Sequence, residues 1–151
     1  VISRSFSKAH GLAALRLGFC VSNPELSDYL NRVRQPFNAN SLALDLGKVA
    51  LSDQEHISKS VKINSSGMER VKKAFANLDY NFIESWGNFI SFDAKQDSDI
   101  AFQYFLEKGV ILRSLKVYEM PHHLRVSIGT EEEMDFFLQV LEDYEKDLSK
   151  K

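Results

Sequence analysis

The sequence predicts an α/β fold, in which helices pack against β-strands. Short apolar segments of strand length alternate along the chain with longer segments of helical periodicity. Of the 151 residues, 44% are hydrophobic and 26% are charged, as in ordinary globular proteins. Internal repeats and low-complexity segments are absent from the sequence. Strands and helices that alternate in this way pack as layers around an apolar core.

The first third of the chain predicts one strand and two helices. Residues 16–22 are short and apolar, which favours a strand. Asn23 is then a preferred N-cap, and Pro24 suits the first position of a helix. This helix should end at Gln35, because the residue before a proline is pushed out of the helical region. A second helix is expected from Ser41 to Leu51.

A long helix is predicted over residues 54–78. Its apolar side chains step by three and four residues, which keeps them on one face: Ile57, Val61, Met68, Val71, Phe75 and Leu78. Gly67 interrupts this pattern at a cost of about 1 kcal/mol relative to alanine. Ser66 and Glu69 form a capping-box pattern, so two helices that meet near Ser66 are the alternative. We predict one continuous helix.

The remaining residues predict three strands and two helices. They are a strand at 88–93, a helix at 98–108, strands at 110–113 and 124–128, and a last helix after Thr130. In the strand at 124–128 the side chains alternate, so Arg125 and Ser127 face away from the apolar side. Thr130 and Glu133 form a capping box at the start of the last helix.

Charge and composition exclude several classes of partner. The formal net charge is −2, so no positive field would attract nucleic acid or an anionic membrane. No stretch approaches the roughly 20 apolar residues that span a bilayer. The single cysteine, Cys20, excludes an internal disulfide and provides too few thiolates for a typical zinc site, so we expect no metal. We expect a cytoplasmic protein, with Cys20 as an inert thiol buried on its strand.

The strongest chemical signal lies between Ser5 and Phe19. Lys8 follows the hydroxyls of Ser5 and Ser7, and an apolar run leads from it to Arg16. An amine in apolar surroundings has a lowered pKa and can act as a nucleophile on carbonyl compounds. The arginine could return to the same pocket and bind a phosphate, with the serines as further donors. The alternative is a solvated loop lysine and a surface arginine.

This segment resembles the lysine signature of class I/II, fold-type I pyridoxal-phosphate aminotransferases. That signature is Ser-x-Ser-Lys followed by a Gly-Leu-Ala-Gly-Leu-Arg-x-Gly-(Tyr/Phe) run, from which this chain departs by carrying Ala14 in place of a glycine. The resemblance implies pyridoxal 5'-phosphate as cofactor. It implies that Lys8 binds the cofactor covalently and moves the proton at the substrate α-carbon. It also implies that Arg16, Ser5 and Ser7 bind the cofactor phosphate.

A second segment, residues 34–43, indicates a narrower group. Its sequence Arg-Gln-Pro-Phe-Asn-Ala-Asn-Ser-Leu-Ala is similar to that of histidinol-phosphate aminotransferases, and related threonine-phosphate decarboxylases carry a similar stretch. Taken residue by residue, it is a proline-broken connection followed by a helix cap. It serves as a marker of the family and predicts no chemistry of its own.

Two later arginines complete the expected site. Arg125 lies in a Leu-Arg-Val-Ser-Ile-Gly-Thr segment that, by the same resemblance, supplies the arginine for the substrate α-carboxylate. Arg113 matches an arginine that helps to bind the substrate phosphate in the histidinol-phosphate enzymes, so the phosphate would fall to Arg113 or Arg125. Most such enzymes have a proline after this arginine, where this chain has Ser114. For Arg113 alone, a solvated strand end is the alternative.

The resemblance covers nearly the whole chain but only the C-terminal portion of the family's fold. The sequence begins at Val1 and reads like the interior of a longer protein. We expect residues 1–52 to be the tail of the large cofactor domain and residues 53–151 to be the small C-terminal domain. The glycine-rich loop, the stacking aromatic residue and the aspartate at the pyridine nitrogen have no counterpart here, so we expect the isolated chain to be inactive.

The predicted parent is a homodimeric aminotransferase that acts between histidinol phosphate and 2-oxoglutarate, in histidine biosynthesis. Its partners would be small molecules, namely a phosphorylated amino alcohol or amino acid and glutamate or 2-oxoglutarate. The alternatives are a threonine-phosphate decarboxylase, another class I/II aminotransferase, and a non-catalytic interaction module.

Overall fold

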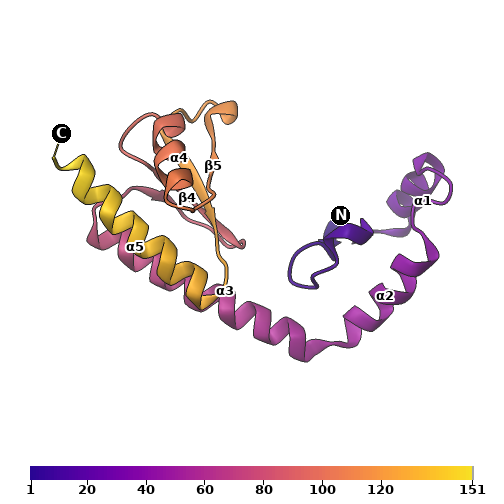
Figure 1. Cartoon of the computed structure of the whole chain (residues 1–151). Coiled ribbons are helices and arrows are strands. Elements are labelled where there is room, and N and C mark those ends of the chain that lie inside the picture. Colours follow the sequence, from indigo (N-terminus) through magenta and orange to yellow (C-terminus); the bar gives the residue numbers. More distant parts are fainter. Residues whose placement is uncertain (151) are drawn as a thin grey trace. The chain divides into compact units, whose positions relative to one another are not determined.

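The computed structural model describes residues 1–150 (Figure 1). These residues form two compact units, one that covers Val1–Val61 and one that begins at Lys62. We call them the first and the second unit and describe each by itself. Within residues 1–150, no helix is both long enough and apolar enough to cross a membrane.

The first unit begins with a two-stranded antiparallel ribbon. Strands β1 (Ile2–Ser5) and β2 (Gly18–Val21) pair so that Ser5 lies opposite Gly18. The connecting loop contains the short 3₁₀-helix η1 (Ala13–Leu15). A β-carbon at Gly18 would lie 2.9 Å from the Arg4 carbonyl oxygen, so the close approach of the strands requires glycine there. The sequence predicted β2 over a wider range, 16–22, and did not predict β1.

Two capped helices follow, as predicted. Helix α1 (Pro24–Val33) begins after Asn23, whose side chain accepts a hydrogen bond from the Leu26 N–H at 2.9 Å. Helix α2 (Ser41–Ser52) begins after Asn40, whose side chain accepts one from the Ala43 N–H at 2.8 Å. Both caps satisfy backbone donors that a helix leaves free at its start.

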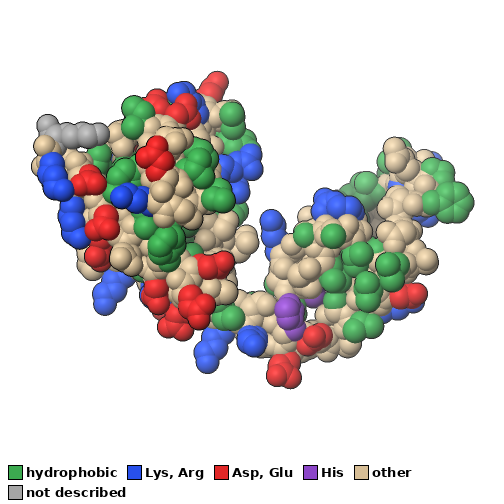
Figure 2. All heavy atoms as spheres, in the orientation of Figure 1, with side chains coloured by type: hydrophobic (Ala, Val, Ile, Leu, Met, Phe, Trp, Pro, Cys, Tyr) green, Lys and Arg blue, Asp and Glu red, His purple; other side chains and the backbone are tan. Residues whose placement is uncertain are grey.

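The first unit buries little apolar surface. Its buried hydrophobic residues are Phe6 and Ala43, whereas Leu42 and Val49 of α2 are 61% and 64% exposed. In Figure 2, apolar side chains lie at the surface over the part of the view that α2 occupies in Figure 1. Cys20 is exposed as well, so the prediction of a buried thiol is wrong. Its strand belongs to a two-stranded ribbon, whose side chains need a second layer for burial.

Helix α3 (Gln54–Asn77) is continuous, which confirms one long helix rather than two. Gly67 is buried within it. A β-carbon at this position would lie 2.6 Å from Cγ2 of Ile128, closer than two carbon atoms can approach. The glycine therefore marks a close packing contact in the middle of the helix.

The second unit contains a four-stranded antiparallel sheet of strand order β3-β4-β6-β5. The strands are β3 (Phe82–Ile83), β4 (Phe89–Asp93), β5 (Arg113–Ser114) and β6 (His123–Ser127). The predicted strand at 110–113 is wrong in its bounds, because pairing with β6 begins only at Arg113. Val110 and Leu112 are nevertheless buried, so the alternation that suggested a strand reflects packing without pairing. Strand β3 was not predicted.

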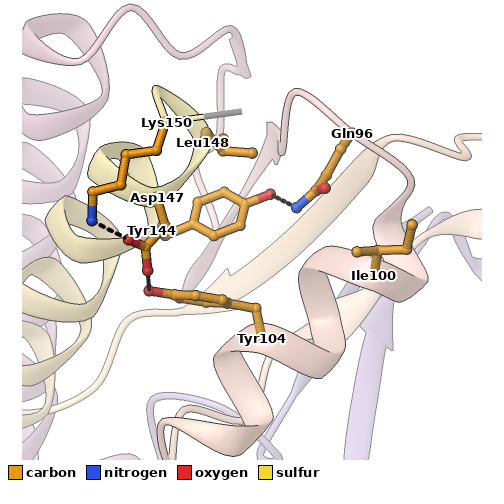
Figure 3. A pocket seen from close by; sticks show the side chains of 7 residues that line it. All are labelled: Gln96, Ile100, Tyr104, Tyr144, Asp147, Leu148 and Lys150. Atoms are coloured by element: carbon orange, nitrogen blue, oxygen red, sulfur yellow. Dashed lines mark hydrogen bonds and ion pairs between the residues drawn. The ribbon is translucent and has the colours of Figure 1, made fainter.

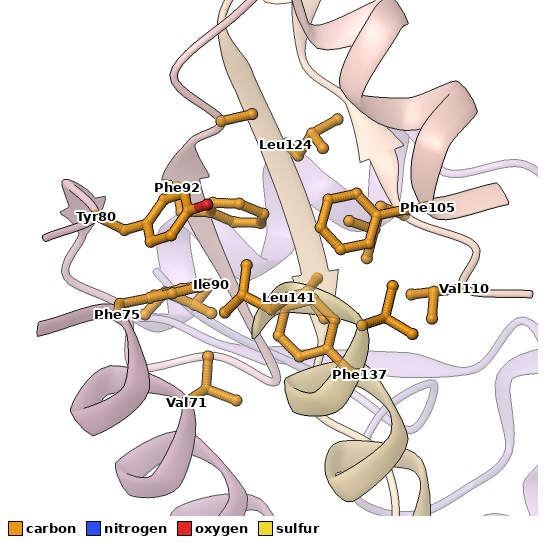
Figure 4. Packing of buried hydrophobic residues seen from close by; sticks show 14 of the residues in the cluster. Val71, Phe75, Tyr80, Ile90, Phe92, Phe105, Val110, Leu124, Phe137 and Leu141 are labelled. Carbon is orange, nitrogen blue, oxygen red and sulfur yellow. The ribbon is translucent and has the colours of Figure 1, made fainter. Parts of the chain in front are cut away.

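Helices α4 (Ser98–Glu107) and α5 (Glu131–Leu148) complete the second unit. The capping box of Thr130 and Glu133 is present, as predicted. Helices α3 and α5 run side by side in Figure 1, and together with α4 they contribute to the same core as the inner face of the sheet. Figure 4 shows this core, in which Phe75, Phe92 and Phe137 pack edge to face or tilted against one another. The α/β prediction is confirmed.

Candidate functional site

The loop between β1 and β2 brings three of the predicted cofactor-binding residues together. The Ser5 hydroxyl accepts a hydrogen bond from the Ser7 N–H at 3.0 Å. Arg16 has left-handed backbone (φ 52°), which turns its side chain back across the loop. Its Nη1 donates to the Ala13 carbonyl oxygen at 2.8 Å and lies 3.5 Å from the Ser7 hydroxyl. The two serines and the arginine thus lie around one turn.

Arg16 keeps part of its donor capacity. Both of its side-chain hydrogen bonds within residues 1–150 involve Nη1. A guanidinium carries five N–H donors, so the Nε and Nη2 edge is available for a two-point interaction with a phosphate or carboxylate. Together with the Ser7 hydroxyl, this edge forms a donor set that suits an oxyanion.

Lys8 lies in the same loop but in a different environment from the one expected. Its carbonyl accepts a hydrogen bond from the Gly11 N–H at 2.8 Å, and Gly11 has a φ of +72°, which glycine adopts without strain. The Lys8 side chain is exposed, and so are Ala13 and Ala14 of the apolar run. The expectation of a buried lysine is therefore wrong for the described residues. The loop closes on itself through local hydrogen bonds, and Phe6 is its one fully buried side chain.

The sheet of the second unit brings the other two predicted residues together. Arg113 of β5 and Arg125 of β6 are directly opposite in the antiparallel register. Residues that are paired in this way project from the same face, with their β-carbons about 5 Å apart. The neighbouring residues Leu124 and Val126 are buried in the core, so the arginines occupy the opposite face.

Aromatic rings, rather than carboxylates, hold these two arginines. The Arg125 guanidinium lies over the Phe89 ring, 4.7 Å from its centroid. An Arg113 Nη2 atom donates to the Tyr118 hydroxyl at 3.2 Å. In the described part of the chain, neither arginine forms an ion pair, and the Nε of Arg125 is buried without a hydrogen-bond partner. Opposed like charges of this kind repel, and a bound anion would relieve the repulsion.

Phe89 and Tyr118 are the site residues that sequence reasoning missed. Phe89 was predicted only as apolar bulk in its strand, and its register with Ser127, two residues after Arg125, places its ring on the outer face. Tyr118 lies in the 3₁₀-helix η2 (Lys116–Tyr118), which no periodicity indicates. Within residues 1–150, no three His, Cys, Asp or Glu side chains are arranged to bind a metal ion.

A separate hollow of about 390 Å³ lies between α4 and α5 (Figure 3). Its polar groups satisfy one another. The Tyr104 hydroxyl donates to Asp147 at 3.1 Å, Lys150 donates to the same carboxylate at 2.8 Å, and Gln96 donates to the Tyr144 hydroxyl at 2.6 Å. None of the predicted site residues lines this hollow.

Comparison with protein families finds one that covers most of the chain. Residues 1–141 match the family described as "Aminotransferase class I and II". The chain is 47% identical over 142 residues to histidinol-phosphate aminotransferase 1 of Nitrosococcus oceani, and 49% identical over 141 residues to histidinol-phosphate aminotransferase 2 of Pseudomonas fluorescens. These matches cover 94% and 93% of this chain, and 38% of each relative's length.

Solved structures show the same fold. The histidinol-phosphate aminotransferase of Sinorhizobium meliloti, in complex with pyridoxal-5'-phosphate, superposes with a TM-score of 0.82 at 24% identity. The match covers 97% of this chain and 41% of that one. The enzyme of the same name from Clostridium acetobutylicum gives a TM-score of 0.85 at 17% identity, over 96% and 45% of the two chains.

Proposed function

Because the chain belongs to the family of class I and II aminotransferases, we propose that it is the C-terminal part of a histidinol-phosphate aminotransferase. The complete protein would transfer an amino group between histidinol phosphate and 2-oxoglutarate. The identity of 47% to 49% with histidinol-phosphate aminotransferases supports this assignment. The geometric observation that carries it is the pair of opposed arginines, since the phosphate of histidinol phosphate and the α-carboxylate of glutamate each need a guanidinium.

The β1–β2 loop fits the phosphate of pyridoxal 5'-phosphate. In this proposal the free edge of Arg16 and the hydroxyls of Ser5 and Ser7 bind that phosphate, at the turn where the Ser7 hydroxyl and Arg16 lie 3.5 Å apart. When bound, pyridoxal phosphate supplies an electron sink for the substrate α-carbon. Lys8 would hold the cofactor through its amine, and once the substrate amine has replaced it there, the released amine of Lys8 would take and return the proton at that carbon.

In this proposal each of the two arginines would bind an oxyanion of a different substrate. Arg125 would bind the α-carboxylate of glutamate, with its guanidinium fixed over Phe89. Arg113, which is tethered to Tyr118, would bind the phosphate of the phosphorylated substrate. The buried, unpartnered Nε of Arg125 is a donor that an oxyanion on this face could satisfy.

The proposal extends to the organisation of the complete protein. Residues 1–52 would belong to the large cofactor domain, and residues 53–151 would form the small C-terminal domain. The complete protein would be a cytoplasmic homodimer that acts on small molecules, without nucleic acid or a membrane as partner. The net charge of −2 supports the exclusion of polyanions. Sedimentation of the complete protein would test the dimer.

Covalent labelling tests the role of Lys8 directly. The purified chain would be incubated with pyridoxal phosphate, reduced with borohydride and mapped by peptide mass spectrometry. We expect the label to concentrate at Lys8 and to disappear in Lys8→Ala. Lys48→Ala is the matched control, because Lys48 is also an exposed lysine of the first unit. Labelling that spreads evenly over the lysines would contradict the proposed role of the loop.

A further inference from the structure

Ser114 connects the arginine face of the sheet to the core side. It follows Arg113 in β5 and lies opposite Leu124, which is fully buried. Successive residues of a strand point to opposite faces, so Ser114 projects toward the core and α4 while Arg113 projects toward Arg125. Whatever fixes Ser114 therefore also fixes the backbone from which Arg113 projects.

A directed chain of hydrogen bonds holds Ser114. Its hydroxyl lies 3.2 Å from Oδ1 of Asp99, and an ionised carboxylate can only accept, so Ser114 donates to Asp99. The Ser98 hydroxyl lies 2.9 Å from the Ser114 hydroxyl and must then be the donor of that bond. Ser98 is fully buried at the first turn of α4, so its hydroxyl cannot form a hydrogen bond with bulk water instead.

Lys116 also belongs to this hydrogen-bond network. Its ammonium lies 2.7 Å from Oδ2 of Asp99 and 3.3 Å from Oδ2 of Asp97. Its backbone N–H also approaches the Ser114 hydroxyl, at 3.4 Å. The end of β5 is thus attached to the start of α4 through a buried hydroxyl, a shared carboxylate and an ion pair.

Such attachment matters because β5 is very short. It contains two residues, and it pairs with β6 through Arg113 with Arg125 and Ser114 with Leu124, followed by one hydrogen bond from the Leu115 N–H to the His123 carbonyl at 3.0 Å. Two arginines directly opposite each other repel, which weakens one of these two pairs. The contacts of Ser114 with α4 therefore help to fix the backbone of this short strand.

We propose that Ser114 is a positioning residue, which holds Arg113 opposite Arg125 so that this face of the sheet can bind the oxyanions of the substrates. This inference rests on the proposed function, in which the two arginines bind phosphate and carboxylate. Ser114 itself faces the other side of the sheet and touches no substrate.

Phosphate titration of the full 151-residue chain tests this role. Inorganic phosphate is the probe, and the side-chain N–H signals of Arg113 and Arg125 report both binding and mobility by NMR. We expect Ser114→Ala to weaken phosphate binding by about threefold to tenfold, the cost of ordering one long side chain on binding. The Arg113 side chain should also become more mobile. Ser114→Thr keeps the hydroxyl and should behave like the unmodified chain.

Three further variants isolate the mechanism. Ser149→Ala removes another hydroxyl of the second unit, one that bonds the Glu145 carbonyl, and should leave phosphate binding unchanged. Asp99→Ala removes the exposed acceptor of the Ser114 hydroxyl and should weaken binding like Ser114→Ala, so the test survives if one variant misfolds. In an Arg113→Gln background, Ser114→Ala should cause no additional loss, because its effect passes through Arg113.

The outcomes of these experiments distinguish a failure of the positioning role of Ser114 from a failure of the anion site. Unchanged affinity and unchanged Arg113 mobility in Ser114→Ala would overturn the positioning role while leaving the arginine site intact. A further loss in the Arg113→Gln background would overturn it too, because Ser114 would then act by another route. If phosphate leaves the Arg113 and Arg125 signals of the unmodified chain unmoved, the proposed anion site fails, and the positioning role fails with it.

Discussion

Gly67→Ala should destabilise the second unit, although alanine favours helices more than glycine does. In an exposed helix the substitution would stabilise by about 1 kcal/mol. At position 67, however, the new β-carbon would lie 2.6 Å from Cγ2 of Ile128. This methyl sits directly on a branched β-carbon, which is stiff at χ1, and it cannot swing away freely. Overpacking of this kind costs about 1–3 kcal/mol, so we expect a net loss of about 1 kcal/mol.

A second substitution, Ile128→Leu, should reverse the sign of the effect of Gly67→Ala on stability. Ile128→Leu removes Cγ2 while keeping the side-chain volume, and Met134 at 3.5 Å from the new β-carbon is in ordinary contact. In the Ile128→Leu background, Gly67→Ala should therefore stabilise by about 0.5–1 kcal/mol. The coupling between the two positions would be about 2 kcal/mol, which is well within the range that double-mutant cycles detect.

Urea unfolding measures both effects. Near-ultraviolet circular dichroism would follow the buried Tyr80 and Tyr144, which report on the packing of the second unit. Ser66→Ala is the control, because it lies next to Gly67 on the exposed side of α3 and should stabilise by no more than a few tenths of a kcal/mol. Equal stabilisation by Gly67→Ala in both backgrounds would refute the close contact.

Three other predictions concern pH, a buried hydroxyl and catalysis. Burial alone would raise the pKa of Glu145, but the neighbouring Tyr80 hydroxyl and Lys95 ammonium lower it. The stabilisation this provides is present above about pH 4.5 and is lost as pH falls through the lower folded pKa, so Glu145→Gln should flatten the acid limb of a stability–pH curve. Burial raises the pKa of Tyr144 to about 12, so the contribution of this hydroxyl to the free energy of unfolding should persist up to about pH 10 and decline above it. Tyr144→Phe removes the 2.8 Å hydrogen bond to the Ala94 carbonyl and should cost about 1 kcal/mol in urea unfolding at neutral pH. The purified chain, which spans 38% of its relatives' length, should show no transamination of histidinol phosphate in a coupled assay, and measurable turnover would contradict this.

The sequence predicted elements well where local signals decide them. Side-chain caps at Asn23, Asn40 and Thr130 depend on one residue and the three that follow, and all three begin helices as expected. It predicted elements poorly where pairing with another strand decides the bounds of the element. Strand β5 begins at Arg113 because that is where β6 can pair with it, and no pattern within residues 110–113 contains that information.

In the candidate site, too, local motifs indicated single residues, whereas contacts between distant segments were not predicted. Motifs indicated Arg113 and Arg125 separately, but only the register of β5 and β6 makes them neighbours. The rings that hold them, Phe89 and Tyr118, were not predicted as part of a site. For Lys8 the apolar run suggested burial, whereas the run itself is largely exposed. Hydrophobicity predicts that a segment requires a covering surface, and it does not say which part of the protein provides one.

The uneven burial of the two units has a consequence for how this chain responds to ligands. The second unit has a core of 18 buried residues, whereas the first unit buries two hydrophobic side chains. Cooperative unfolding, with its denaturant dependence, should therefore arise from the second unit, while the first opens in small local fluctuations. An anion bound to Arg113 and Arg125 would shift the melting temperature of this cooperative unit. A cofactor bound at the Lys8 loop would instead slow amide exchange and proteolysis in that loop, and a thermal-shift screen alone would miss it.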